Sequence, residues 1–248
     1  MDRFQANHAR AFFDYLALTK GYAGRTYNDK ITVLSTFANE MIDREWVTKN
    51  PFRKIKKVPI GIGRNIAFSD TEKEKLKAYL QENDRQMYYF TQFVHYCFIR
   101  RSELTRLKIH NIDWQNKTII IPSNASKNKK QESVVIPDSF WPVLEEMDLK
   151  SKPKDWFIFG RHLQPCPTQY KNYNHISTRH NEQAKEIGIE ADKGLYSWKH
   201  SGVCALYAAT KDIYAIMRQC RHSDIKTTQI YLKSLGLIDN NVVRAANW

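Results

Sequence analysis

The sequence predicts a mainly helical protein with a small β-hairpin or sheet, divided into a helical N-terminal domain and a larger mixed α+β domain. Three observations predict this. Apolar residues recur at helical spacing near the N-terminus, two short β-branched runs lie close together mid-chain, and helical patterns joined by short turns fill the chain beyond about residue 168. The 248 residues, 42% of them apolar, suffice for a globular protein with one large core or two modest ones.

Two amphipathic helices are expected in the first fifty residues. Ala9, Phe12, Phe13 and Leu16 share one helical face, and Gly21 follows at the position of a helix C-cap. A second stripe recurs at gaps of four and three and runs through Tyr27, Ile31, Leu34, Ala38 and Met41.

A break and a basic segment follow these helices. Asn50 and Pro51 end the helical pattern. Residues 52–65, FRKIKKVPIGIGRN, read as a linker because they are basic, contain Pro and Gly and lack a sustained period. The same segment suits a path along a DNA backbone, and both interpretations stay open.

The larger domain is expected to begin with a helix capped at Ser69. Residues 86–99 are apolar on most sides and predict a buried helix, after which Ser102 offers an N-cap. The runs 118–122 (TIIIP) and 133–137 (SVVIP) predict a hairpin whose long tip, SNASKNKKQE, is polar and basic.

Charge points to a polyanionic partner. The formal net charge is +13 and the pI is about 9.5, with both parts of the chain basic, which suits a protein that grips DNA from two sides. A basic protein without an anionic partner is the alternative. The sequence shows no membrane span or signal peptide and predicts a cytoplasmic protein. No metal-ligand spacing is evident among the four cysteines, which are expected to be reduced thiols: Cys97, Cys166, Cys204 and Cys220.

The most chemically suggestive run lies near the C-terminus. His222 precedes Tyr231 by nine residues, and Ser223 is a possible cap for a helix that carries Tyr231. Thr227 and Thr228 lie four and three residues before Tyr231, so both would neighbour it on that helix. Taken alone, a tyrosine here is more simply a packing residue.

A second cluster lies upstream, where an apolar helix runs directly into Arg100, Arg101, Ser102, Glu103 and Leu104. An arginine anchored in this way presents a planar fork that binds a phosphate through two hydrogen bonds. A surface arginine at a helix end is the simpler alternative for this cluster alone.

Together these motifs resemble the tyrosine recombinase or phage integrase family over nearly the whole chain. The family's first box matches Arg100 to Leu104, and its hairpin lysine matches Lys127. Its late Leu-Gly-His-Ser box, followed by Thr-Thr and Tyr, matches residues 220–231, with Cys220 and Arg221 in place of Leu and Gly.

One box departs further from the family's pattern of His-x-x-Arg followed by His. Tyr196 stands at the first His position, Lys199 at the Arg position and His200 after it. Lysine keeps the positive charge but loses the planar fork, and tyrosine is a poor base near neutral pH. Some integrases of Bacteroides-type mobile elements look similar here, so a subgroup variation is expected rather than a loss of activity.

The resemblance implies a mechanism without metal or cofactor. Tyr231 attacks the scissile phosphorus and forms a 3′-phosphotyrosine, while Arg100, Lys199 and His222 stabilise the transition state. Lys127 protonates the leaving oxygen, with Lys129 and Lys130 as rivals for that role because the tip is long. Tyr196 orients a neighbour or a phosphate oxygen.

The resemblance also implies partners and domains. A helical core-binding (SAM-like) domain spans residues 1–58, a linker 59–65 and the catalytic domain 66–248. The implied complex is a tetramer on paired double-stranded DNA sites. The chain starts too late for the arm-binding domain that many integrases carry, and a truncated form and a shortened form are the two interpretations. The C-terminal tail either packs on its own domain or docks on a neighbouring subunit. Two hypotheses compete with this one: a type IB topoisomerase, and a DNA-binding relative with weakened catalysis.

Overall fold

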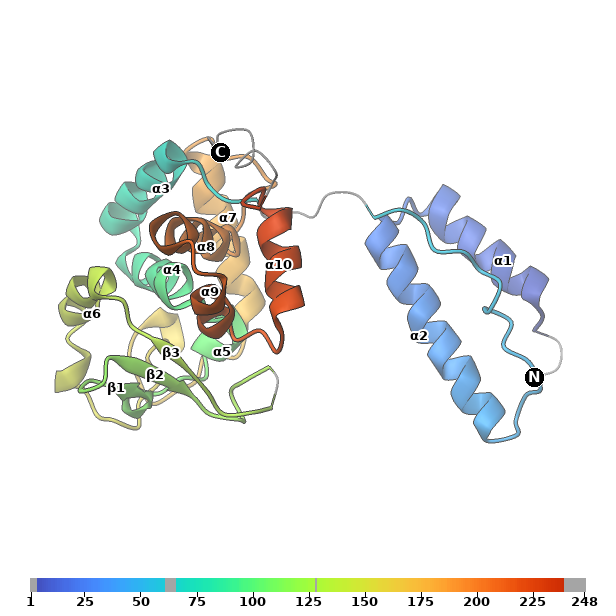
Figure 1. Cartoon of the computed structure of the whole chain (residues 1–248), viewed down its shortest axis with the longest axis horizontal. Coiled ribbons are helices and arrows are strands. Elements are labelled where there is room, and N and C mark those ends of the chain that lie inside the picture. Colours follow the sequence, from blue (N-terminus) through green and yellow to red (C-terminus); the bar gives the residue numbers. More distant parts are fainter. Residues whose placement is uncertain (1–3, 61–65, 128, 239–248) are drawn as a thin grey trace, which may run out of the picture. The chain divides into compact units, whose positions relative to one another are not determined.

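The structure is a computed structural model that describes residues 4–60, 66–127 and 129–238. The chain divides into two compact units, Met1–Gly63 and Arg64–Trp248 (Figure 1). Each unit has its own hydrophobic core.

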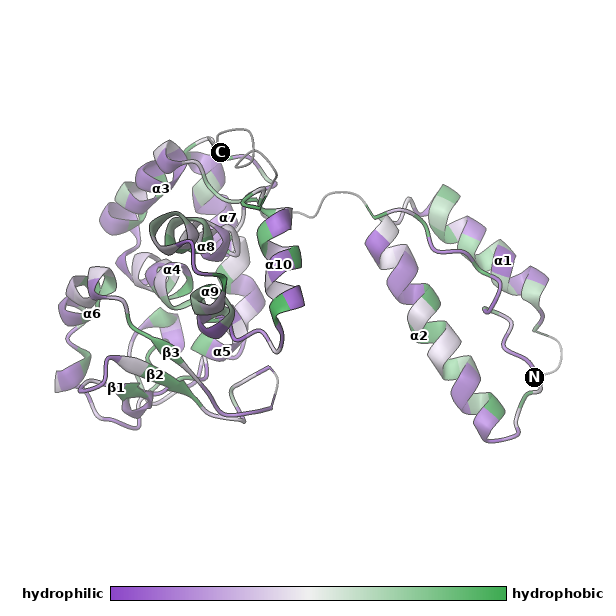
Figure 2. Cartoon of the chain, viewed as in Figure 1, coloured by the Kyte–Doolittle hydropathy of each residue, from purple (hydrophilic) through white to green (hydrophobic). Residues whose placement is uncertain are grey.

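The first unit is a pair of helices, α1 (Ala6–Asp14) and α2 (Gly24–Asp43), with a π-helical turn at Tyr15–Thr19 extending α1. Hydrophobic and hydrophilic residues alternate along both helices (Figure 2). The predicted stripe on α2 is confirmed, with only Leu34 partly buried. On α1 the prediction is wrong for Phe12, which is 42% exposed. Among the described residues of this unit, α1 buries a narrow stripe that includes Ala9 and Phe13, and Phe12 lies outside it.

Residues 52–58 pack against these helices. Phe52 is buried in the core of the first unit, and its ring lies 6.2 Å from that of Phe13. The side chain of Asn28 bonds Val58 twice, accepting from its N–H at 2.9 Å and donating to its C=O at 2.8 Å. The linker interpretation is therefore wrong for residues 52–58, and residues 61–65 lie outside the described residues.

The second unit is mainly helical with one small sheet (Figure 1). Its first helix begins at Ser69 as predicted, because the Ser69 hydroxyl accepts from the Glu72 N–H while the Glu72 carboxylate accepts from the Ser69 N–H. The α-helices are α3 (Asp70–Asn83), α4 (Arg85–Cys97), α5 (Arg101–Leu104), α6 (Trp141–Glu146), α7 (Tyr173–Glu186), α8 (Ser197–Thr210), α9 (Ile213–Cys220) and α10 (Ile225–Ser234). Short 3₁₀ turns lie at Ile109–Asn111, Asp138–Phe140, Leu149–Ser151 and Arg161–Leu163.

The sheet is antiparallel, in the order β1-β2-β3. Strands β2 (Thr118–Ile121) and β3 (Glu132–Val135) form the predicted hairpin, with Ile119 opposite Val134. The short strand β1 (Ile112–Asp113), which the sequence did not predict, pairs with β2. Buried residues alternate along β2, so one face of the sheet packs on the core.

Helix α4 is the central helix of the second unit, as its apolar sequence predicts, and it packs against α8. The contact is close at Gly202 on α8, where an added Cβ would overlap the carbonyl oxygen of His95. The His95 ring also bonds the Trp198 carbonyl, at 3.1 Å. Gly202 therefore sets the separation of the two helices.

Replacing Gly202 with Ala is expected to lower the free energy of unfolding by at least about 2 kcal/mol, because the methyl group has no space against the α4 backbone. Urea unfolding measures the change. Ala208→Val is the control, since it enlarges an exposed residue of the same helix and costs less than about 1 kcal/mol. A wild-type unfolding midpoint for Gly202→Ala would contradict the close contact.

The chain beyond Tyr231 packs on its own unit as far as the structure describes it. Leu232 is fully buried in a cluster with Phe98 and Val203. Leu235 and residues 237–238 are partly buried against the same cluster. Up to residue 238 the self-packing alternative therefore holds, and the rest of the tail lies outside the described residues.

Candidate active site

Arg100 lies where α4 gives way to α5. Helix α4 ends at Cys97, its C-cap residue Phe98 is left-handed with φ at 55°, and Arg100 occupies the N-cap position of α5. The cap is formed by Glu103, whose carboxylate accepts the Arg100 backbone N–H at 3.1 Å and its guanidinium at 3.0 Å. The prediction that Ser102 caps this helix is wrong, because Ser102 lies inside α5 and the longer Glu103 reaches back to the helix start.

Glu103 is completely buried and joins three parts of the site. Besides Arg100, its carboxylate accepts from Arg221 Nη2 at 2.7 Å and from the Lys127 backbone N–H at 3.1 Å. Burial raises the pKa of Glu103, but the hydrogen bond and charge of Arg221, the Lys127 N–H and the charge of Arg100 outweigh it and hold the pKa at about 2. The carboxylate is therefore ionised near pH 7.

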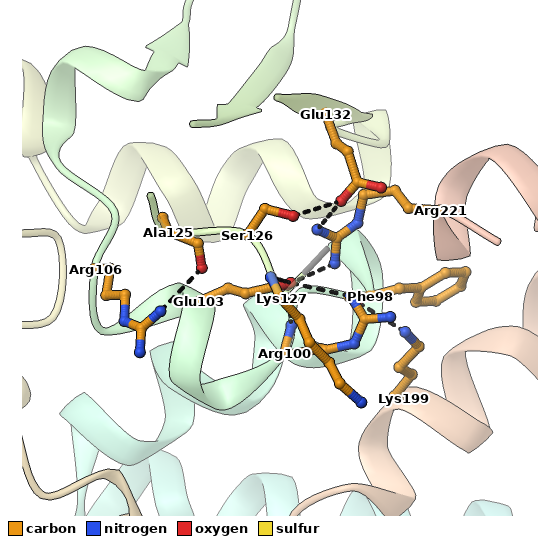
Figure 3. Close-up of polar contacts among 10 residues, drawn as sticks. All are labelled: Phe98, Arg100, Glu103, Arg106, Ala125, Ser126, Lys127, Glu132, Lys199 and Arg221. Atoms are coloured by element: carbon orange, nitrogen blue, oxygen red, sulfur yellow. Dashed lines mark hydrogen bonds and ion pairs between the residues drawn. The ribbon is translucent and has the colours of Figure 1, made fainter. Parts of the chain in front are cut away.

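Lys127 enters the site from the tip of the β2–β3 hairpin. It lines, with Arg100 and Tyr196, a cavity of about 510 Å³. Its backbone N–H bonds the Glu103 carboxylate (Figure 3), while its side chain is exposed, as are Lys129 and Lys130 further along the tip. This placement brings Lys127 and Arg100 to one cavity.

Lys199 is buried on α8, with its ammonium donating to the Phe98 carbonyl at 3.0 Å (Figure 3). Burial lowers the pKa of Lys199 to about 8. Cys220 opposes this with the next largest effect, the charges of Arg100 and Arg221 lower the pKa further, and Glu103 raises it slightly. Lys199 is therefore a cation near pH 7 that loses its proton under mildly alkaline conditions.

Tyr196 precedes α8 at the mouth of the site. The residue is 40% exposed, and its ring centroid lies 5.7 Å from the Lys199 ammonium. Partial burial raises the pKa of Tyr196, despite the opposing charge of Arg100. It is therefore a neutral hydrogen-bonding group near pH 7 and no base.

Tyr231 lies on α10 with its hydroxyl 2.7 Å from Nδ1 of His200. Burial raises the pKa of Tyr231, so the hydroxyl holds its proton in the free protein. Burial, with a smaller effect of the Lys199 charge, lowers the pKa of His200 to about 4, which leaves its ring neutral near pH 7. The sequence interpretation gave His200 no role, although it directly follows Lys199 in the matched box and contacts Tyr231 in the structure.

His222 lies beside Tyr231, with 5.7 Å between ring centroids. Its Nδ1 is 2.9 Å from the Thr228 hydroxyl, which orients the ring. Burial and the charges of Lys199 and Arg100 lower the pKa of His222 to about 4, so it is a neutral N–H donor near pH 7. Helix α10 is capped by Asp224 rather than by Ser223, because the Asp224 carboxylate accepts the Thr227 N–H at 2.8 Å.

The structure thus gathers the predicted site residues from α5, the hairpin tip, α8 and α10. Within the described ranges, no group of three or more His, Cys, Asp or Glu side chains is placed to hold a metal ion. In that same part of the chain no helix has the length and apolarity needed to cross a membrane. The arrangement suits a nucleophile beside several cations and neutral hydrogen-bond donors, as the transfer of a phosphodiester requires.

The phage integrase family model matches residues 66–236, which includes every one of these side chains. The chain belongs to the phage integrase family. The family and the fold make it a site-specific tyrosine recombinase, an enzyme of DNA recombination.

Curated relatives agree with this membership. Tyrosine recombinase XerC of Leptospira interrogans is 23% identical over 235 residues, covering 90% of this chain and 72% of the relative. An integrase/recombinase of Escherichia coli is 21% identical over 267 residues, covering 91% of this chain and 76% of the relative.

Solved structures share the fold of this recombinase. The Tn1549 transposon integrase in complex with circular intermediate DNA gives a TM-score of 0.72 at 16% identity, covering 98% of this chain and 84% of that one. A lambda integrase dimer bound to a COC′ core site gives 0.75 at 12% identity, covering 96% and 83%. The predicted fold class, mainly α with a small sheet, is confirmed.

Proposed function

We propose that this recombinase cuts and rejoins double-stranded DNA through a 3′-phosphotyrosyl intermediate formed by Tyr231. The observation that carries the proposal is the position of the Tyr231 hydroxyl, which is hydrogen-bonded to the neutral His200 close to the buried cation Lys199. In the forward step the Tyr231 oxygen bonds to phosphorus and the bond from phosphorus to the 5′-oxygen breaks. The reverse step, by a 5′-hydroxyl of another strand, rejoins the DNA without an external energy source.

His200 accepts the Tyr231 proton in this proposal. With Nδ1 unprotonated, the ring accepts the hydroxyl hydrogen bond directly. The pKa of His200 is about 4 in the free protein, and a phosphodiester anion in the site favours the imidazolium and so raises it. Tyr196, which stands where the family carries a histidine, is too weak a base for this role.

The remaining residues stabilise charge and the leaving group. Arg100 and Lys199 offset the negative charge of the transition state, and His222 donates a hydrogen bond to a phosphate oxygen. Lys127 gives a proton to the departing 5′-oxygen. Tyr196 orients a phosphate oxygen from the mouth of the site.

The proposed function also implies an oligomeric state, a role for the first unit and an origin of the protein. Exchange between two duplexes breaks four strands, and each protomer has one Tyr231. We therefore propose a tetramer on paired sites. The lambda integrase structure is a dimer bound to a core site. The first unit is proposed as the core-binding domain, and action on DNA places the protein in the cytoplasm. Tyr196 and Lys199 support an origin among integrases of Bacteroides-type mobile elements.

Covalent capture tests the proposed function without knowledge of the target site. The protein is incubated with randomised duplexes nicked on one strand, so that the short fragment released by cleavage diffuses away and traps the adduct. Strands that remain attached in detergent are sequenced, and the attachment site on the protein is mapped by mass spectrometry. We expect enrichment of one family of sequences attached at Tyr231. Absence of any adduct would contradict enzymatic cleavage, and relaxation of supercoiled DNA without joining of two sites would indicate a topoisomerase.

The variant His200→Asn is expected to form adduct about 10²-fold more slowly, because asparagine offers a hydrogen-bond acceptor but cannot take up a proton. Single-turnover rates at saturating protein measure the effect on the captured duplex. His175→Asn is the matched control, since His175 pairs with the Tyr170 hydroxyl at 3.0 Å on the surface. An unchanged rate for His200→Asn would assign the proton to another acceptor.

A further inference from the structure

Arg221 occupies a position whose backbone favours glycine. It follows α9 in the left-handed region, with φ at 59°, where a side chain is normally strained. The matched family box has glycine at this position. The arginine side chain nevertheless turns inward and is only 3% exposed.

The guanidinium of Arg221 lies between two carboxylates (Figure 3). Nη2 contacts Glu103 at 2.7 Å, and Nη1 contacts Glu132 on β3 at 3.3 Å. Its Nε has no hydrogen-bond partner among the described residues, so the polar contacts of the fork go to these two acids. Arg221 therefore ties α5 to the second strand of the hairpin.

Both acids hold the segment that carries Lys127. Glu103 accepts the Lys127 backbone N–H at 3.1 Å, and Glu132 accepts the Ser126 hydroxyl at 3.0 Å. Two consecutive residues of the hairpin tip are thus anchored to carboxylates that share one arginine. The sequence predicts a long polar and basic tip. In the structure, these contacts hold Ser126 and the Lys127 backbone in place.

The Arg221 guanidinium is not presented to a bound phosphate, because its side chain is only 3% exposed and its two terminal nitrogens contact Glu103 and Glu132. Its side chain reaches the site only through Glu103 and Glu132.

We propose that Arg221 is a positioning residue that holds Lys127 in place to protonate the leaving 5′-oxygen. The inference rests on the proposed function, in which Lys127 is the general acid. Removal of the fork frees the tip, so that the Lys127 ammonium meets the 5′-oxygen less often while the Tyr231 nucleophile is unchanged.

A change of leaving group isolates this step. In a duplex whose scissile phosphate has a bridging 5′-sulfur, Tyr231 still forms the bond to phosphorus, but the bond from phosphorus to sulfur breaks and the electron pair leaves as a thiolate. A thiol has a pKa of about 8.5, so the thiolate departs without a proton. A defect in the general acid therefore slows cleavage of the oxygen substrate and spares the sulfur substrate.

Arg221→Gly is the decisive variant, because glycine suits the left-handed backbone and removes only the side chain. We expect its single-turnover cleavage of the captured oxygen duplex to fall about 10²-fold and that of the 5′-sulfur duplex to fall less than about tenfold. Arg221→Lys keeps a charge but not the planar fork. We expect its cleavage of the oxygen duplex to fall by less than that of Arg221→Gly, again with little effect on the sulfur duplex. Lys211→Gly, at an exposed left-handed position that ends α8, is the matched control and should cleave both duplexes at the wild-type rate.

The results of this experiment can contradict the role of Arg221 without contradicting the proposed function. An equal loss on both duplexes, or no loss, overturns the positioning role of Arg221 even while Tyr231 still forms adduct. Lys127→Ala is the benchmark, and it should show the same preference for sulfur as Arg221→Gly. If Lys127→Ala loses both activities equally, Lys127 is not the general acid, and the inference fails with that assignment.

Discussion

The variant Tyr231→Phe is expected to form no covalent adduct with DNA, with cleavage at least about 10⁴-fold below wild type, because phenylalanine has no oxygen to bond to phosphorus. The captured nicked duplex and detergent gel electrophoresis measure the loss. The variant should still bind the duplex, since the missing hydroxyl bonds His200 in the described structure and the ring keeps its packing.

Tyr214→Phe is the matched control for this experiment. Tyr214 lies on the neighbouring helix α9 and is 60% exposed, so removal of its hydroxyl should leave adduct formation at the wild-type rate. A Tyr231→Phe protein that still becomes attached to DNA would assign the nucleophile to another residue.

The sequence predicts the helices and the order of the motifs because both are local properties. The spacing of Tyr27, Ile31, Ala38 and Met41 alone identifies the buried face of α2. The caps are harder to assign, since Ser102 and Ser223 have suitable side chains. The structure instead uses Glu103 and Asp224, whose carboxylates reach the free backbone N–H groups.

The contacts that organise the site are not local, and the sequence pattern does not contain them. The Tyr231 hydroxyl meets His200 across 31 positions, and Arg221 meets Glu103 across 118. Whether an arginine at residue 221 weakens a motif or completes a buried network depends on the packing of α9 against β3. A departure from a family pattern is therefore interpretable only with the partners of the new side chain.

The second large effect is a fall in the rate of adduct formation at alkaline pH, caused by deprotonation of Lys199. The pKa of Lys199 is about 8 because of its burial, so its positive charge is lost at higher pH. With DNA below saturation, the adduct rate reports the free protein and should fall above pH 8 by up to about tenfold per unit. Burial raises the pKa of Cys204, Cys220 and Tyr196, so these neighbours keep their protons longer and do not produce this limb.

Substitutions at Lys199 isolate its charge. Lys199→Met should cleave about 10³-fold more slowly near pH 7, because one cation of the site is missing. Lys199→Arg stays charged throughout, so its activity should persist or rise and its alkaline limb should disappear. A flat wild-type profile from pH 7 to 9.5, or an unchanged limb in Lys199→Arg, would remove Lys199 from the charge-stabilising role.

The contribution of Lys199 to the free energy of unfolding should rise with pH while the cleavage rate falls. Unfolding would therefore not explain the loss of activity. The pKa of Lys199 is about 8 in the folded chain and 10.5 in the unfolded one, so the unfolded chain binds more protons between these values. The contribution of Lys199 to the free energy of unfolding therefore rises from pH 8 to 10.5. Over this range urea unfolding should show wild type gaining stability relative to Lys199→Met while its cleavage rate falls. Parallel losses of stability and activity would show that the alkaline limb reflects unfolding and not the charge of one lysine.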